Sequence, residues 1–319
     1  MKKFDVTALG ELLVDFTENG ISAQGNTLLE ANPGGAPCNV LAMLKNLGKK
    51  TAFIGKIGND ALGKMLKKTV EDQGICIDNL VEDEEIHTTL AFVHSDKDGD
   101  RSFSFYRNPG ADLMLQWEEI NVDFLVNTKI FHFGTLSMTE EEIKNVTKKA
   151  VQKAKENGVL ISFDPNFRPP LWKDMEDARQ QTWYGIGQCD ILKISDDEIL
   201  FLTGTKDIDE GIARIREKSH AKLICATMGK NGSKVYYKGK TVFGRPFLRK
   251  DTIETTGAGD TFMACVLNTV LEKGLEQLTQ ESLTEMLLFA NAASSIITTR
   301  KGALKVMPQR QEILDCLIS

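Results

Sequence analysis

The sequence predicts an α/β protein whose mostly parallel central sheet is covered by helices on both faces. Apolar, strand-like runs alternate with amphipathic helical segments through the centre and the C-terminal part of the chain, as in a parallel sheet that is buried on both sides. No repeat, low-complexity segment or linker rich in Pro, Gly or Ser divides the 319 residues. We therefore expect a single domain over residues 1–319.

The predicted elements can be followed along the chain. The first strand covers Phe4–Leu9, and a later one covers 129–133. The helix after that strand is expected to begin with a capping box of Thr139 and Glu142 and to end at Gly158. Strands over 159–163, 191–194 and 222–227, a helix that ends near Gly204 and a helix over 208–217 complete the alternation.

The first third of the chain contains two β-rich pieces instead. Residues 15–32 lack a helical pattern, and residues 87–106 predict a hairpin of two strands, 88–93 and 102–106. Because neither piece is large enough for a domain, we expect a small β-sheet lid formed by about 12–33 and 87–112.

The hairpin turn carries three aspartates, Asp96, Asp98 and Asp100, at a spacing similar to that of a calcium loop. Its glycine is at the wrong offset and no Glu closes the loop. A solvated hairpin tip is therefore favoured.

The composition excludes several classes of protein. With 45 Asp and Glu against 39 Lys and Arg, the net charge is −6, which argues against a nucleic-acid or membrane-surface partner. The six cysteines are far apart and mostly lie in apolar runs, which favours buried free thiols in a reducing compartment. No apolar run reaches the ~18 residues of a membrane span, and the start of the chain lacks the apolar run of a signal peptide. A cytoplasmic location is predicted.

The most informative motif is the glycine cluster of residues 254–260, which ends in Gly257-Ala258-Gly259-Asp260. It follows a strand-like segment and precedes the apolar helix of residues 261–267. Small residues at a helix start expose backbone N–H groups that can bind a phosphate. Asp260 in such a hole could be a base for phosphoryl transfer, or a common N-terminal helix Asp. The residues leave both interpretations open.

A second cluster, Gly34-Gly35, leads through Ala36 and Pro37 to Asn39 at the start of an apolar helix. The glycines allow a ligand to approach the backbone closely, and Asn39 offers a donor and an acceptor. An ordinary N-cap is the alternative, and these residues alone favour it.

The motif that starts at Gly58 matches G-x-x-x-x-G-K but continues with Met65. A P-loop needs Ser or Thr at that position to hold Mg²⁺, and a thioether does not bind this hard cation. We do not interpret it as a P-loop.

Several polar segments follow predicted strands, and parallel strands collect such residues at one sheet edge. Arg168 could bind a phosphate or carboxylate bidentately, or pair with a structural Asp. The Thr227 loop could be only a turn, and His132 is more typical of a core residue. The segments expected at this edge are Asp15, the Gly34 cluster, Arg168, residues 195–198, the Thr227 loop and the Gly257 cluster.

At this point the two glycine motifs are specific enough to name a family. Gly34-Gly35-x-x-x-Asn39 and Thr256-Gly257-Ala258-Gly259-Asp260 resemble the two signatures of the ribokinase-like (PfkB) carbohydrate kinases. The order of motifs matches over essentially the whole chain. The strings at 32–37, 106–112, 163–172 and 192–198 are most similar to those of fructokinases.

The resemblance implies a ribokinase-like three-layer sandwich and phosphorylation of D-fructose to fructose 6-phosphate with ATP and Mg²⁺. It implies that Asp260 is the base, that the Gly257, Ala258 and Gly259 amides stabilise the transferred phosphoryl, and that Arg168 lies near sugar and phosphate. By position, the implied sugar ligands are Asp15, Gly34, Gly35, Asn39 and Arg107, and the implied nucleotide neighbours are Lys193, Ser195, Thr227, Gly229, Gly232, Gly257, Gly259 and Asn291.

The resemblance also implies metal sites, in segments that depart from the family pattern. Glu198 ends the family's N-x-x-E element, which organises Mg²⁺ through water, although Ser195 replaces its Asn. Glu254 replaces the usual Asp of the second signature. In relatives that use K⁺, this segment and the loop at Arg300 supply the ligands. The implied monovalent-cation residues are Glu254, Thr256, Arg300 and Gly302.

Other functions are compatible with parts of this pattern. A 2-keto-3-deoxygluconate kinase would share the fold and Arg168, and Arg107 could then bind the sugar's carboxylate. Ribokinases and adenosine kinases match the quoted strings less well. A catalytically inactive binding protein on the same fold is disfavoured by the intact Asp260, and an NAD-binding protein by the missing G-x-G-x-x-G after the first strand. A homodimer formed through the lid is expected from the family and from the exposed hairpin edge at 101–106.

Overall fold

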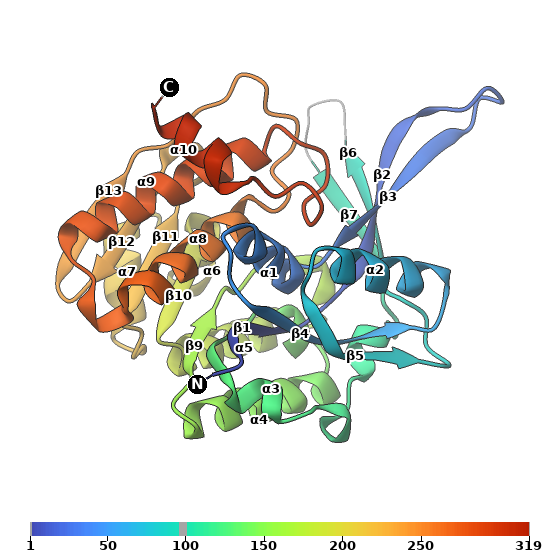
Figure 1. Cartoon of the computed structure of the whole chain (residues 1–319), viewed down its shortest axis with the longest axis horizontal. Coiled ribbons are helices and arrows are strands. Elements are labelled where there is room, and N and C mark those ends of the chain that lie inside the picture. The colour runs from blue at the N-terminus through green and yellow to red at the C-terminus, as the bar shows by residue number, and fades with distance from the viewer. Residues whose placement is uncertain (1, 96–100, 319) are drawn as a thin grey trace.

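The computed structural model describes residues 2–95 and 101–318, and its largest feature is a nine-stranded sheet (Figure 1). The strand order is β13-β12-β11-β10-β9-β8-β1-β4-β5. All neighbours pair in parallel except β11–β12 and β12–β13, so that β12 alone runs against the other strands. The bounds are β1 Phe4–Leu9, β4 Thr51–Gly58, β5 Cys76–Asp83, β8 Thr128–Phe133, β9 Leu160–Phe163, β10 Ile191–Ser195, β11 Leu223–Thr227, β12 Ser233–Tyr237 and β13 Lys240–Gly244.

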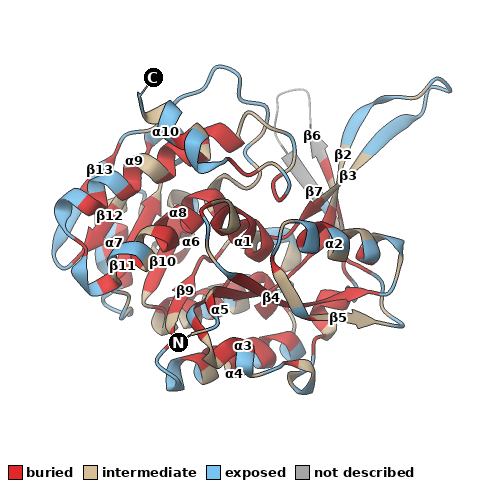
Figure 2. Cartoon of the chain, viewed as in Figure 1, coloured by how far each residue is buried: buried red, intermediate tan, exposed pale blue. Residues whose placement is uncertain are grey.

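Helices cover both faces of this sheet and bury a separate hydrophobic core on each (Figures 1 and 2). Successive residues of a strand serve different cores: Leu223 and Cys225 of β11 join one, and Ile224 and Ala226 join the other. This explains why the strands read as continuous apolar runs. One face carries α1 Ala36–Asn46, α2 Ala61–Asp72, α8 Ala258–Lys273, α9 Gln280–Ile297 and α10 Arg310–Ile318, and the other carries α3 Asp123–Val126, α4 Glu141–Glu156, α5 Met175–Gln188, α6 Asp196–Thr203 and α7 Ile208–Arg216.

The two β-rich pieces of the first third form one small sheet. Its strand order is β3-β2-β6-β7. The outer pairs are antiparallel, and the central β2–β6 pair is parallel, with Asp15 opposite Ala91. β2 and β3 extend away from the body of the molecule, and their far ends are exposed (Figures 1 and 2). The bounds are β2 Leu13–Ile21, β3 Thr27–Gly34, β6 Leu90–Ser95 and β7 Arg101–Tyr106.

The predicted α/β class and mostly parallel sheet are confirmed, and the strands predicted with stated bounds agree with the observed ones to within two residues. The hairpin of β6 and β7 is confirmed too, while the aspartate-rich tip at 96–100 lies outside the described residues. Four cysteines, Cys38, Cys189, Cys225 and Cys265, are buried free thiols. His132 is buried as expected and lies 2.9 Å from the Ser162 hydroxyl through Nδ1.

Two local predictions are wrong. The helix α4 begins with Glu140 as its N-cap, and the Thr139 hydroxyl instead donates to the Leu136 carbonyl oxygen at 3.2 Å. A buried arginine, Arg107, donates to the same hydroxyl, so tertiary contacts displace the local capping box. The strand expected before Gly257 is also not observed, because residues 245–257 form an irregular segment after β13.

Within residues 2–95 and 101–318, no helix combines the length and the apolar character needed to cross a membrane.

Candidate active site

A cavity of about 870 Å³ lies where the carboxyl ends of the large sheet face the small sheet. Leu13 and Asp15 of β2 and Phe105 of β7 line it from the small sheet. Most of the residues predicted for the site are among its lining: Asp15, Gly35, Asn39, Arg168, Lys193, Ser195, Glu198, Thr256, Gly257, Gly259 and Asp260.

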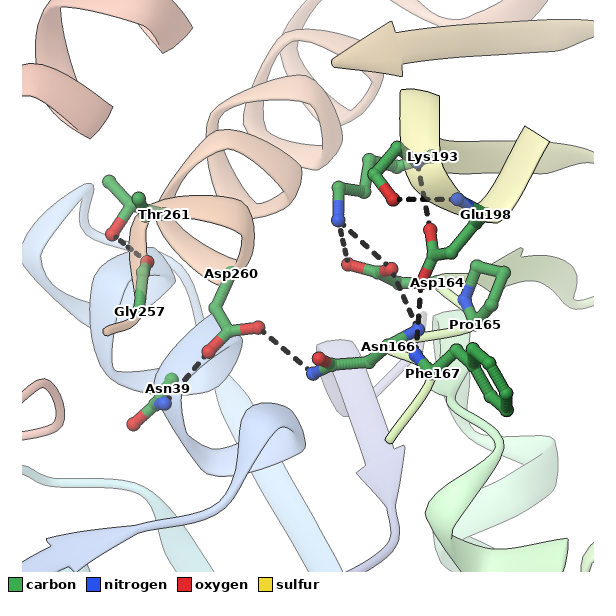
Figure 3. Close-up of polar contacts among 12 residues, drawn as sticks. Asn39, Asp164, Pro165, Asn166, Phe167, Lys193, Glu198, Gly257, Asp260 and Thr261 are labelled. Atoms are coloured by element: carbon green, nitrogen blue, oxygen red, sulfur yellow. Dashed lines mark hydrogen bonds and ion pairs between the residues drawn. The ribbon is translucent and has the colours of Figure 1, made fainter. Parts of the chain in front are cut away.

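Asp260 lies in the first turn of α8, whose N-cap is Gly257 in a left-handed conformation with φ of 77°. The carboxylate does not turn back to the helix: Oδ2 accepts from Asn39 Nδ2 at 2.8 Å, and Oδ1 accepts from Asn166 Nδ2 at 3.4 Å (Figure 3). Burial raises the pKa of Asp260, against the hydrogen bond from Asn39 and the charges of Lys193 and Arg168. A merely helix-stabilising Asp would not need these partners.

The start of α1 is shaped by a close backbone approach. The N-cap Gly35 has φ of 128°, and a Cβ atom there would lie 2.4 Å from the Glu11 carbonyl oxygen, so only glycine fits. Since Gly35 has no side chain, the Glu11 carboxylate caps the helix instead and accepts from Ala36 N at 2.7 Å. The sequence alone favoured Asn39 as an N-cap, but this is wrong. Asn39 lies in the second turn of α1, and its side chain donates to Asp260.

Lys193 and Asp164 form a buried ion pair beside the start of α8, with 3.1 Å between Nζ and Oδ2. Burial lowers the pKa of Lys193, but the negative charges of Asp164 and Glu198 outweigh the effect of burial, so the pKa is raised overall. A Cβ atom on Gly259 would lie 3.0 Å from Lys193 Nζ, which places the ammonium group next to the small residues of the glycine cluster. Positive charge and exposed backbone N–H groups thus meet in one place.

Glu198 anchors two backbone segments at the cavity wall. Its Oε1 accepts from Phe167 N at 2.9 Å, and its Oε2 accepts from Ser195 N at 2.8 Å. Ser195 Oγ accepts from Glu198 N at 3.3 Å, which completes a capping box at the start of α6. The carboxylate is 7% exposed, so its remaining contact with solvent is through the cavity.

Asp15 and Arg168 line the cavity, Asp15 from the small sheet and Arg168 from the loop after β9. Burial raises the pKa of Asp15 to about 7, Arg168 lowers it, and Glu254 and Asp260 add to the rise. The site therefore holds several carboxylates near two cations, Lys193 and Arg168. Such a charge arrangement suits a ligand that is rich in hydroxyls and carries phosphate.

Arg107 does not line this cavity, although the family pattern implied that it would reach the sugar. Its guanidinium is buried and donates to Asp112 Oδ2 from Nε at 2.9 Å, to Thr139 Oγ1 at 3.0 Å and to the Leu136 carbonyl oxygen at 2.9 Å. The Asp112 carboxylate binds the Arg107 guanidinium and so holds its positive charge in the protein interior, away from the cavity. In this structure Arg107 joins the end of β7 to the segment before α4.

The residues implied for the nucleotide fall into two groups. Lys193, Ser195, Gly257 and Gly259 line the cavity, whereas the other four lie outside it. Asn291 of α9 donates to the Arg245 carbonyl oxygen at 3.0 Å and accepts from Ser233 Oγ at 3.1 Å. The residues outside the cavity are Thr227, Gly229, Gly232 and Asn291.

Gly34 and Ala258 flank the cavity without lining it. A Cβ atom on Gly34 would lie 2.5 Å from Asp15 Oδ2, so this glycine leaves room for the carboxylate. Ala258 is the first residue of α8.

The segments implied for a monovalent cation are held together. Ile253 and Glu254 donate backbone N–H groups to the Thr298 carbonyl oxygen at 2.8 and 3.1 Å, and Gly302 N donates to Glu254 Oε1 at 2.7 Å. Arg300 donates to the Val306 carbonyl oxygen at 2.8 Å. The two loops expected to share a cation are therefore neighbours.

Three site residues escaped the sequence reasoning: Glu11, Asp164 and Asn166. Each follows directly or closely after a predicted strand, at 4–9 or 159–163. Ligands bind at the carboxyl ends of parallel strands, which is why Arg168 was expected at the site, and the same reason holds for these three residues. Asp15 shows the limit of that argument, because it lies within β2 rather than after a strand.

Comparisons with known proteins agree with this geometry. The family model described as pfkB family carbohydrate kinase matches residues 3–310. The chain is 40% identical over 319 residues to "Probable fructokinase-2" of Arabidopsis thaliana, covering 98% of this chain and 95% of the relative. It superposes with a TM-score of 0.90 and 30% identity on a Xylella fastidiosa fructokinase solved with bound ATP, over 100% of this chain and 99% of the other. A Vibrio cholerae fructokinase in a fructose, ADP and calcium ion bound form superposes with a TM-score of 0.88 and 29% identity, over 98% of this chain and 99% of the other. The chain belongs to the pfkB family of carbohydrate kinases.

Proposed function

We propose that this protein is a fructokinase, which transfers the terminal phosphoryl group of ATP to D-fructose and forms D-fructose 6-phosphate and ADP. The observation that carries the proposal is the Asp260 carboxylate, which lies in the cavity at the start of α8, beside the exposed backbone of Gly257 to Gly259. Such a junction of a base and an anion site can bring a hydroxyl group and a phosphoryl group together for transfer. The plant and bacterial fructokinases that this chain is similar to support fructose as the acceptor.

On the sugar side, Asp15, Gly34, Gly35 and Asn39 would hold the hydroxyl groups. Asn39 Oδ1 is buried and has no hydrogen-bond partner among the described residues, which leaves it able to accept from a sugar hydroxyl. Asp15 would approach from the small sheet. We leave Arg107 out of the sugar site because its donors bind Asp112, Thr139 and Leu136.

On the reacting side, Asp260 would accept the proton of the attacking hydroxyl as the new O–P bond forms and the bond to ADP breaks. The proton transfer is late in a loose transition state, so an ionised carboxylate is a sufficient base. The Gly257, Ala258 and Gly259 amides and the Lys193 ammonium would stabilise the charge of the transferred group. Arg168 would contribute from the opposite wall.

On the nucleotide side, Ser195 and Lys193 would lie near the phosphates, and Thr227, Gly229, Gly232 and Asn291 near the rest of the nucleotide. Thr227 ends β11, Gly229 and Gly232 follow it, and Asn291 lies on α9, all outside the lining of the cavity that holds Asp260. An extended ligand could occupy both regions.

Magnesium fits this site only as a nucleotide-bound ion. Both oxygens of Glu198 already accept backbone hydrogen bonds, and the described residues contain no cluster of three His, Cys, Asp or Glu that could hold a metal. Mg²⁺ usually keeps several waters and binds through substrate phosphates, so Glu198 would orient its water ligands. When bound, the ion neutralises phosphate charge. Potassium would bind between the Glu254–Thr256 segment and the Arg300–Gly302 loop.

We further propose that residues 1–319 act as one kinase domain whose lid, about 12–33 and 87–112, closes over the sugar and excludes water. Two lids would pair in a homodimer. Leu28 and Leu29 on β3 and Tyr106 on β7 are exposed at the two edges of the small sheet, where unpaired strands invite association. The cytoplasmic location stays a prediction of the sequence.

The proposal is tested by comparing D-fructose with 2-keto-3-deoxygluconate in a coupled ADP-release assay. We expect fructose to give the higher kcat/KM. A strong preference for the acidic sugar would replace fructokinase by 2-keto-3-deoxygluconate kinase, for which Arg168 would be the carboxylate ligand. Tight sugar binding without turnover would indicate an inactive binding protein.

A further inference from the structure

The side chain of Asn166 approaches the Asp260 carboxylate from the side opposite to Asn39 (Figure 3). Each carboxylate oxygen thus accepts from one amide, at 2.8 Å from Asn39 and 3.4 Å from Asn166. The two amides come from different parts of the chain, α1 and the loop after β9. Such a two-sided arrangement restricts rotation of the carboxylate about its χ2 angle, which is otherwise broad for Asp.

The backbone around Asn166 is held in place at three consecutive residues. The Pro165 carbonyl oxygen accepts from Thr135 N at 3.0 Å, Asn166 N donates to Asp164 Oδ1 at 3.2 Å, and Phe167 N donates to Glu198 Oε1 at 2.9 Å. Asn166 itself has φ of 47°, in the left-handed region that Asn tolerates better than most residues. The turn therefore holds the Asn166 backbone in place, and the position of its Cβ atom with it.

The same turn reaches the phosphate side of the cavity. Asp164, which binds Asn166 N, also pairs with Lys193, and Lys193 lies next to Gly259. The orientation of the base and the position of the cation are thereby linked through one short segment, residues 164–166.

We propose that Asn166 is a positioning residue for Asp260, which, together with Asn39, holds the carboxylate in the ionised, correctly oriented state that accepts the sugar proton. The inference rests on the proposed function. It predicts an effect on proton transfer, with little effect on sugar affinity.

The charged groups that face Asp260 come from several elements. Burial opposes its ionised form, and Lys193 of β10 and Arg168 after β9 favour it. The Asp260 charge in turn raises the pKa of the neighbouring Asp15 and Asp164 carboxyl groups. Glu11, which follows β1, and His132 of β8 share a small polar cavity with Asp260, and burial lowers the pKa of His132 to about 3. His132 is therefore neutral. Since Asn166 donates to the ionised form, its loss should raise the Asp260 pKa.

The test uses two substitutions, Asn166→Gly and Asn166→Asp, in the full-length chain. Glycine accepts a φ of 47° without strain and removes only the amide, whereas aspartate keeps the size and replaces the donor by a carboxylate. We expect kcat in single-turnover experiments to fall about 10- to 100-fold for Asn166→Gly and further for Asn166→Asp. At saturating fructose, the pH profile of kcat reports the enzyme–substrate complex and not the Asp15 ionisation that governs kcat/KM. The acid limb of this kcat profile should shift up by about 0.5–1 pH unit for Asn166→Gly and more for Asn166→Asp. The KM for fructose should stay within about threefold of the wild-type value.

Two control substitutions, together with the result for Asn166→Gly, separate the possible causes. Asn145→Asp places the same charge change on the exposed face of α4 and should leave all parameters unchanged. If Asn166 served only to accommodate the turn, Asn166→Gly would keep wild-type kcat and acid limb, and the inference would be wrong. Asp260→Asn tests the proposed function separately. Near-normal turnover of this variant would show that Asp260 is not the base. An inactive Asp260→Asn variant together with Asn166 variants of normal activity would refute only the positioning role. If Asn166→Gly does not fold, the acid limb of Asn166→Asp tests the inference by itself: an upward shift supports the positioning role, and an unchanged limb refutes it.

Discussion

The start of α8 and the small β-sheet face each other across the cavity, yet they are built very differently. Asp260 at the start of α8 is 7% exposed and accepts hydrogen bonds from two amides. The far end of the small sheet is exposed, with Ile21 at 65% and Leu28 at 47% (Figure 2). The chemistry is thus assigned to a helix start that packs into the core on one face of the large sheet, and substrate enclosure to a thin sheet with few buried side chains. Rigid orientation and movable cover are requirements that one element could not meet together.

The largest expected effect comes from the buried side. Asp260→Asn should lower kcat at least about 10²-fold, because the amide cannot accept the hydroxyl proton. Folding and fructose binding should be largely retained, since the side chain keeps its size. A coupled ADP-release assay measures turnover, and calorimetry measures sugar binding. Asp72→Asn, on the exposed part of α2, is the matched control. Near-normal turnover of Asp260→Asn would remove this residue from the mechanism.

The next largest effect is expected at the start of α1. Gly35→Ala should destabilise the protein by about 2–4 kcal/mol and reduce activity, because φ is 128° and the new Cβ would lie 2.4 Å from the Glu11 carbonyl oxygen. Chemical denaturation measures the free energy of unfolding. Gly187→Ala, in α5, is the control: its Cβ would meet only the Lys218 carbonyl oxygen at 3.8 Å. There we expect a change between zero and a gain of about 1 kcal/mol from helix propensity. Equal effects of the two substitutions would contradict the proposed shape of the α1 start.

On the small-sheet side, Asp15→Asn should raise the KM for fructose about 10-fold or more and leave the KM for ATP within about twofold, because a charged hydrogen-bond acceptor is lost. The wild-type kcat/KM for fructose should rise with pH through about 7, where Asp15 ionises. Initial rates measured between pH 5.5 and pH 8.5 test both statements.

The same carboxylate has a stability effect of known sign. Its folded pKa of about 7 lies above its ordinary value of 3.8, so its contribution to stability is lost as the pH rises from about 4 to about 7. Asp15→Asn should therefore raise the melting temperature more at pH 8 than at pH 4. An equal change at both pH values would show that the pKa of Asp15 is not raised.

The smallest effect on catalysis is expected at the sheet edge. Leu29→Lys should shift the protein toward a monomer in size-exclusion chromatography with light scattering, because a charge at the edge of β3 opposes strand pairing. We expect kcat to change by less than about threefold. Lys240→Glu, on the exposed β13 edge of the large sheet, is the control and should leave the mass unchanged. A monomeric wild-type protein would refute the lid dimer.

The parts that were predictable are those determined by neighbours in the sequence. Strands such as Phe4–Leu9 read as apolar runs because both faces of the large sheet are buried, and Gly257 to Asp260 stood out because small residues precede an apolar helix. Arg168, Ser195 and Glu198 were expected at one sheet edge because they follow predicted strands, and they line the same cavity. The local capping-box pattern failed at Thr139, which instead contacts Arg107 from 32 residues away.

The α/β class, the parallel sheet and the glycine cluster that carries Asp260 could thus be predicted, because each depends on periodicity or on residues that are adjacent in the chain. That Asn39 and Asn166 both bind Asp260, across separations of 221 and 94 residues, became visible in the folded chain alone. The tertiary structure also turns Arg107 inward to Asp112 and pairs β2 with β6 to make one small sheet. Such contacts depend on which groups are desolvated together, and desolvation is a property of the folded whole.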